Sequence, residues 1–109
     1  DQYHGIHFTS NKLHRCDQNK KEPRITYSAS CHTKDDINLC NKKLLDFILI
    51  SPVLRTHNTY SALNWSGFSK LSEYSYLPTF ALGGLSSDSD HFQICIKHNG
   101  FGIAGISNI

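Results

Sequence analysis

The chain has 109 residues, a formal net charge of +2 and a hydrophobic fraction of 39%. A chain of this length buries roughly 60–70% of its unfolded surface, so we expect one globular domain over residues 1–109. The small charge gives no argument by itself for nucleic-acid binding, and no apolar segment is long enough to span a bilayer, so we expect no membrane partner.

Residues 3–31 have the pattern of a hairpin. Apolar residues alternate with polar ones on both sides of a charged turn at 17–23, which is the period of a strand with one buried face. We therefore expect two antiparallel strands, carrying the apolar residues Ile6, Phe8, Ile25, Tyr27 and Ala29.

A helix is expected over residues 34–49. Thr33 is a good N-cap, and Asp36 completes a Thr-x-x-Asp box. The helix should end before Ser51-Pro52, because a residue before proline avoids the helical conformation. Its buried stripe should comprise Ile37, Cys40, Leu44, Phe47 and Ile48.

Short apolar runs with turn residues between them fill residues 64–109. The runs 92–96 and 103–106 have the length of strands, and Gly83-Gly84 marks a turn. These runs predict an antiparallel meander. The fold class is therefore α+β, with one helix packed on an antiparallel sheet after an N-terminal hairpin.

Four cysteines in a short chain favour two disulfides and a secreted protein: Cys16, Cys31, Cys40 and Cys95. The helical stripe favours Cys40–Cys95, but the remaining pair would then join the tip and the base of a long hairpin, so the pairing stays open. Asn64-Trp65-Ser66 is a glycosylation sequon. The seven histidines are scattered without metal-ligand spacing, so we expect no metal and no cofactor.

Several short motifs occur in the order and approximate spacing of the small fungal guanyl-specific ribonucleases. They are Gly67-Phe68, Tyr74-x-x-x-Pro78, Asp90-His91-Phe92 and Ile103-Ala104-Gly105-Ile106. The chain resembles this family over roughly residues 28–109, and the resemblance implies a microbial ribonuclease-like fold.

The resemblance also implies that the ribonuclease site is degenerate. The family's catalytic glutamate falls on Tyr76, its arginine on His91, its final histidine on Ile109 and its first histidine near Tyr60. A carboxylate base and an imidazolium acid each contribute about 10²–10⁴-fold to such a reaction. The expected protein is therefore not an enzyme.

A secreted, catalytically empty ribonuclease fold is similar to the RNase-like effectors of cereal powdery mildew fungi. The resemblance implies a monomeric virulence effector that is translocated into the host plant cell. Its implied partners are host plant proteins, including an immune receptor of the NLR type that recognises it as an avirulence determinant. Weak RNA binding would use Tyr74, Tyr76, His91, Lys20, Lys21 and Arg24.

The alternative function is an active secreted guanyl-type ribonuclease. Its rearranged site would use His57 and Glu73 as acid and base.

Overall fold

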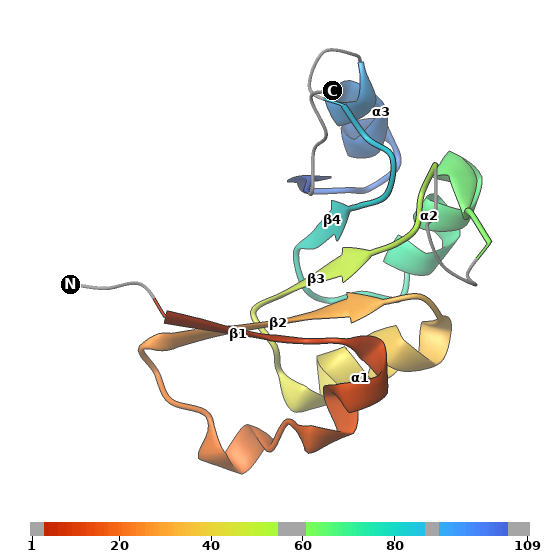
Figure 1. Cartoon of the computed structure of the whole chain (residues 1–109). Helices are drawn as coiled ribbons and strands as arrows, with labels where there is room; N and C mark the ends of the chain where they lie inside the picture. Colours follow the sequence, from red (N-terminus) through yellow and green to blue (C-terminus); the bar gives the residue numbers. More distant parts are fainter. Residues whose placement is uncertain (1–3, 55–60, 87–89, 105–109) are drawn as a thin grey trace.

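The structure is a computed structural model that describes residues 4–54, 61–86 and 90–104. Within these residues five strands form one parallel sheet in the order β1-β2-β3-β4-β5 (Figure 1). The strands are β1 His4–Phe8, β2 Ile25–Cys31, β3 Phe47–Ile50, β4 Thr79–Ala81 and β5 Gly102–Ile103. The α-helices are α1 Lys34–Lys43, α2 Asn64–Ser72 and α3 His91–Lys97, and two 3-10 helices, η1 Ser10–Arg15 and η2 Gln18–Lys20, join β1 to β2.

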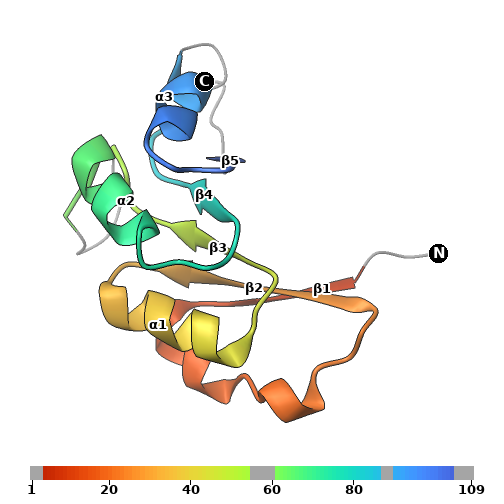
Figure 2. The same cartoon turned by 180° about the vertical axis from the view of Figure 1, so that it is seen from behind.

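The helices cover one face of this curved sheet, as Figures 1 and 2 show from opposite sides. Residues paired across parallel strands point to the same face, and alternate residues of a strand point to opposite faces. The register places Cys31, Ile50 and Ala81 in one row, and all three side chains are fully buried. Parallel strands in consecutive order with intervening helices are the arrangement of (β/α)₈ barrels.

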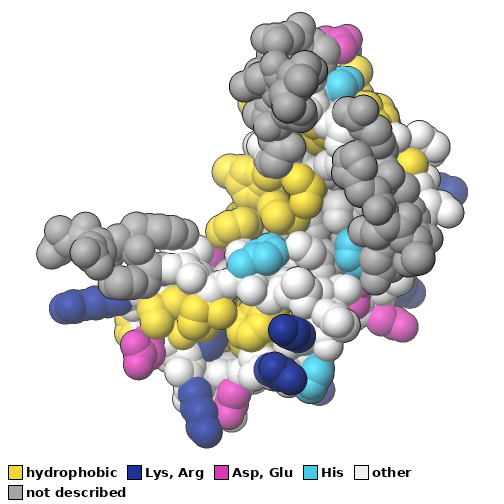
Figure 3. Space-filling model, in the orientation of Figure 1, with side chains coloured by type: hydrophobic (Ala, Val, Ile, Leu, Met, Phe, Trp, Pro, Cys, Tyr) yellow, Lys and Arg dark blue, Asp and Glu magenta, His cyan; other side chains and the backbone are white. Residues whose placement is uncertain are grey.

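The described residues leave the opposite face, here called the inner face, largely uncovered. Its central row is Ser30, Leu49, Phe80 and Gly102. The Phe80 ring makes edge contacts with Phe47 and Phe101, each at 5.5 Å between ring centroids. Phe101 is 65% exposed, and apolar side chains gather at the middle of the molecule in Figure 3. The chain thus has a covered outer face and an open, partly aromatic inner face.

The prediction of an N-terminal hairpin is wrong in its pairing. Both strands exist, but β1 and β2 run parallel, with His4 opposite Ile25 and Phe8 opposite Ala29. The two 3-10 helices return the chain to the start of β2, where a hairpin turn would have reversed it. Alternation of apolar and polar residues marks a strand in either direction, so the pattern did not contain the information that decides the pairing.

The predicted helix at 34–49 is confirmed at its start and wrong at its end. The Thr33 side chain accepts a hydrogen bond from the Asp36 N–H at 3.2 Å, as its role as N-cap requires. The helix ends at Lys43, because Leu44 adopts a left-handed conformation with φ 58°. Residues 47–50 then form the central strand β3, hydrogen-bonded to β2 and β4. Leu44 is 63% exposed, so it is no part of the core.

The predicted antiparallel meander over 64–109 is also wrong. Residues 64–72 and 91–97 are helices, and the strands in this region that the structure describes run parallel to β3. A run of five apolar or neutral residues such as 92–96 fits a strand or a helix equally well by length. Asn64, the residue of the sequon, is the first residue of α2. No helix within the described residues is long and apolar enough to cross a membrane.

The predicted disulfides are not formed in the structure. All four cysteines lie in described segments, carry free thiols and are buried. Cys31 Sγ and Cys40 Sγ lie 3.5 Å apart, at the distance of a thiol hydrogen bond. That contact raises the pKa of Cys31, and burial raises the pKa of Cys95. Buried thiols of this kind are small apolar core residues.

We predict that Leu44→Gly stabilises the domain. A left-handed conformation costs a non-glycine residue roughly 1–2 kcal/mol, and Leu44 buries little surface in return. The free energy of unfolding, measured by urea denaturation, should rise by about 1 kcal/mol. Lys42→Gly is the matched control, because Lys42 is exposed and helical, and there glycine should lower stability. Loss of stability in Leu44→Gly would contradict the proposed helix end.

We also predict that the unfolded, non-reduced protein carries four reactive thiols. The native protein should react slowly with a thiol reagent, because each sulfur is buried and at most 4% of any cysteine is exposed. The measurement is a thiol titration with and without denaturant, followed by mass spectrometry. A denatured, non-reduced protein with no free thiols would restore the hypothesis of two disulfides.

Candidate active site

Three loops follow the carboxyl ends of β2, β3 and β4 and are held together by hydrogen bonds. The His32 Nδ1–H donates to the carbonyl oxygen of Ser51 at 2.8 Å, which joins the first loop to the second. The Leu54 N–H donates to the Gly83 carbonyl oxygen at 2.9 Å, which joins the second loop to the third. Parallel strands end at one edge, and in barrels of this arrangement that edge carries the active site.

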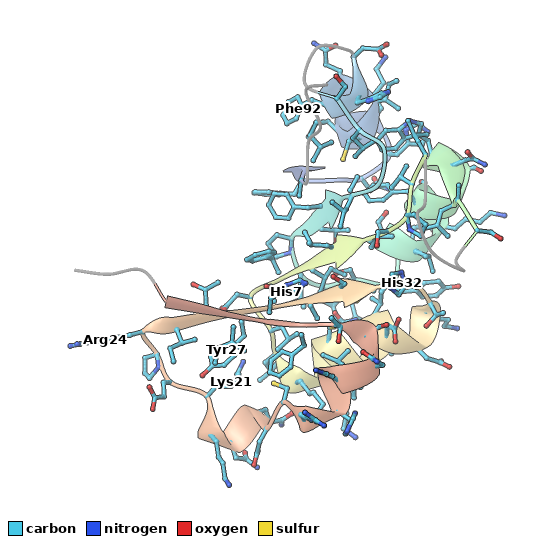
Figure 4. The ribbon with its side chains drawn as sticks, in the orientation of Figure 1. His7, Lys21, Arg24, Tyr27, His32 and Phe92 are labelled. Atoms are coloured by element: carbon cyan, nitrogen blue, oxygen red, sulfur yellow. The ribbon has the colours of Figure 1, made fainter. Side chains whose placement is uncertain are left out.

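Hydrogen bonds hold both the backbone and the side chain of His32. Its backbone N–H donates to Asp36 Oδ2 at 3.0 Å, so the residue is part of the α1 cap. A carbonyl oxygen only accepts hydrogen bonds, so the bond to Ser51 requires a proton on Nδ1. The imidazole therefore has a set orientation at the carboxyl end of β2, where Figure 4 shows it.

The turn Gly83-Gly84 has a backbone that suits anion binding. The two residues have φ 117° and 72°, a region that side-chain-bearing residues rarely adopt. Neither glycine N–H donates to another residue of the described chain. Successive backbone N–H groups in such turns form concave sites for phosphate oxygens. In barrels, phosphate often binds at the loops that follow the last strands.

Close to this edge, His7 of β1 bridges two serines of β2 on the inner face. Its Nδ1 lies 2.7 Å from Ser28 Oγ and its Nε2 lies 2.8 Å from Ser30 Oγ. Ser28 is 6% exposed, and Ser30 is partly buried. Partial removal of water from the imidazole lowers the pKa of His7 below its ordinary value, so the ring is neutral at pH 7. Figure 4 shows His7 over the sheet between β1 and β2.

The residues assigned to a degenerate ribonuclease site do not form one cluster. Tyr60 and Ile109 lie outside the described residues, as does His57 of the alternative site. Tyr76 is 89% exposed and precedes β4, at the amino-terminal edge of the sheet. His91 begins α3, after the carboxyl end of β4, and its Nδ1 accepts from the Ser86 N–H at 3.0 Å. Tyr76 and His91 thus belong to opposite edges.

The other residues predicted to bind RNA lie at the amino-terminal edge. Lys20 ends η2, Lys21 and Arg24 precede β2, and Tyr74 follows α2. Figure 4 shows Lys21, Arg24 and Tyr27 at the end of β2 away from His32. The Lys21 ammonium donates to the Leu44 carbonyl oxygen. A pocket of about 290 Å³ opens there, lined by Gln18, Lys21, Glu22, Pro23, Ile25, Tyr27 and Asp46.

The residues at the carboxyl-terminal edge were not among the site residues predicted from the sequence. His32 counted only as one scattered histidine, and Gly83-Gly84 counted only as a turn. The available signal was position: a polar or glycine residue directly after each short apolar run of an alternating strand–helix pattern. The described residues contain no group of three or more His, Cys, Asp or Glu able to hold a metal ion.

Comparison with known proteins agrees with this geometry. A family model described as thiamine monophosphate synthase, TMP-TENI, matches residues 2–109. A curated protein of Aquifex aeolicus (strain VF5), "Putative thiamine-phosphate synthase 2", is 27% identical over 105 residues, which cover 94% of this chain and 55% of that protein.

A solved structure shares the fold. The thiamine phosphate pyrophosphorylase from Pyrococcus furiosus superposes with a TM-score of 0.70 at 21% identity, over 94% of this chain and 49% of that one. The chain therefore spans about half the length of the relatives that it matches.

These matches overturn the hypothesis of an RNase-like effector. The parallel sheet excludes the antiparallel ribonuclease fold, and the family match covers nearly the whole chain. Five further predictions rested on that resemblance or on the disulfides, and they are wrong. They are secretion, delivery into a plant cell, a plant NLR receptor as partner, the alternative of an active ribonuclease, and the absence of enzymatic activity. The chain belongs to the thiamine monophosphate synthase (TMP-TENI) family.

Proposed function

We propose that this chain takes part in enzymatic synthesis of thiamine phosphate and binds phosphate groups of its small-molecule substrates at the carboxyl-terminal edge of the sheet. The proposal is supported by the family match and by the names of two relatives, a putative thiamine-phosphate synthase and a thiamine phosphate pyrophosphorylase. Both names describe chemistry on a phosphate ester, and the second describes a reaction that involves pyrophosphate.

The observation that carries the proposal is the joining of three loops at this edge. The hydrogen bonds His32–Ser51 and Leu54–Gly83 hold the ends of β2, β3 and β4 in one continuous row. Donor groups therefore stand in fixed positions before a ligand arrives. Fixed donors stabilise developing negative charge without reorganisation at the moment of reaction, which is a large term in catalysis of group transfer.

The donors at this edge are of the kind that bind phosphate oxygens. The Gly83 and Gly84 N–H groups lie in a turn that only glycine adopts easily. The Ser30 hydroxyl lies one residue from the carboxyl end of β2, on the inner face. Hydrogen bonds from such groups to a charged oxygen are roughly twice as strong as those between neutral groups. A leaving pyrophosphate would be held by these donors as its negative charge develops.

The Gly84 position allows a charge test with a matched control. Aspartate and asparagine have similar shape, and both tolerate the left-handed conformation, here φ 72°, better than other residues. Gly84→Asp places a carboxylate beside the bound phosphate, and like charges a few ångströms apart near a surface cost roughly 1–4 kcal/mol. We expect pyrophosphate affinity to fall by about tenfold or more in Gly84→Asp and much less in Gly84→Asn.

Binding is measured by calorimetry with pyrophosphate and with thiamine phosphate, and turnover by phosphorus NMR of the two ligands mixed with the protein. Circular dichroism checks that both variants keep the fold. Equal affinities in Gly84→Asp and Gly84→Asn would contradict phosphate binding at this turn. Thiamine without its phosphate should bind more weakly than thiamine phosphate.

A further inference from the structure

His7, Ser28 and Ser30 form a hydrogen-bonded line across two strands. His7 and Ser28 are register partners, and Ser30 lies two residues further along β2, toward the carboxyl-terminal edge. Both nitrogens of the imidazole contact a serine hydroxyl, at 2.7 and 2.8 Å. The line therefore begins at a buried serine and ends at a serine on the inner face, next to the proposed phosphate site.

A neutral imidazole has one donor and one acceptor, so two arrangements exist. In one arrangement, Ser28 donates its proton to Nδ1 and the Nε2–H donates to Ser30 Oγ. The Ser30 hydroxyl proton then points away from His7. In the other arrangement, Ser30 donates to Nε2 and has no proton left for a ligand.

The burial of Ser28 selects between these arrangements. Ser28 is 6% exposed, and within the described chain its hydroxyl contacts no acceptor other than His7. If Nδ1 carried the proton, the Ser28 proton would be buried without a partner, which costs free energy that folding avoids. Ser30 is partly exposed, so its proton can go to water or to a ligand. The arrangement with the proton on Nε2 therefore gives every one of these hydroxyl protons an acceptor.

We infer that His7 is a positioning residue that accepts the proton of Ser28, donates to Ser30 and so keeps the Ser30 hydroxyl as a hydrogen-bond donor to a phosphate oxygen. This inference rests on the proposed function of the same edge, and it deepens it by naming the group that sets the direction of one donor. In this role His7 acts through Ser30.

The first test reads the tautomer in the free protein. Nitrogen-15 NMR of the histidine ring at neutral pH should show the proton of His7 on Nε2. In Ser28→Ala the preference should weaken, because Nδ1 loses its donor. A proton on Nδ1 in the wild-type protein would overturn the inference, and this result does not depend on any ligand.

The second test measures pyrophosphate affinity. Ser30→Ala removes a donor to a charged oxygen and should weaken binding by about tenfold or more. His7→Phe keeps a ring of similar size without nitrogens and should weaken binding to a similar extent, since it frees the Ser30 hydroxyl to turn away. The double variant should be no weaker than Ser30→Ala alone. His7→Gln, whose amide donates and accepts, should restore part of the affinity.

Thr26→Val is the matched control, because Thr26 lies two residues before Ser28 on the same face and outside the line. Its affinity should equal that of the wild type. Two results would overturn the role of His7: a loss of affinity in the double variant equal to the product of the two single losses, or unchanged affinity in a folded His7→Phe protein. In either case, pyrophosphate binding by the wild-type protein would still uphold the proposed function. A wild-type protein that does not bind pyrophosphate would instead reject the proposed function.

Discussion

Parallel pairing of β2 with both of its neighbours is the constraint on which the rest of this structure depends. It places the carboxyl ends of all paired strands at one edge. Alternation along β2 puts Tyr27, Ala29 and Cys31 on the helix-covered face and Ser28 and Ser30 on the inner face. An antiparallel β1 would end at the opposite edge from β2, and it would then bring its residues to β2 in reverse order. The gathering of the three loops at one edge is thus a consequence of strand direction.

The two faces of the sheet differ in burial, and this explains why its strands are not continuous apolar runs. Parallel sheets are commonly buried on both faces and read as continuous apolar runs. In β3 and β4, however, burial alternates, with Ile48, Ile50 and Ala81 covered and Leu49 and Phe80 only partly covered. Gly102 lies so close to the Phe80 ring that an added Cβ would stand 3.0 Å from it. The inner face therefore has room for a ring to lie across β5, and the polar residues of its described central row lie on β2.

The sequence contained enough information to locate several elements but not to orient them. Alternation marked β1 and β2, and the Thr33 cap marked the start of α1, because these signals depend on residues close in the chain. Strand direction depends on how η1 and η2 fold between β1 and β2. Six polar or charged residues in a row gave no pattern from which these 3-10 helices could be predicted. The same limit applies to the site. His7 lies 21 and 23 residues from its two serine partners, so no local pattern joins them.

The two edges of the sheet differ in the hydrogen-bond partners that their polar groups already have. At the amino-terminal edge the cation of Lys21 already binds the Leu44 carbonyl oxygen and lies 5.7 Å from the centre of the Tyr27 ring, while Asp46 Oδ2 accepts the Tyr27 N–H. These interactions connect the segments that surround the start of β2. At the carboxyl-terminal edge, the His32 side chain and the Leu54 N–H hold the loops, while the Gly83 and Gly84 N–H groups donate to no other residue of the described chain. The carboxyl-terminal edge of the described chain therefore keeps backbone N–H donors and the Ser30 hydroxyl in positions where a phosphate ligand can accept from them.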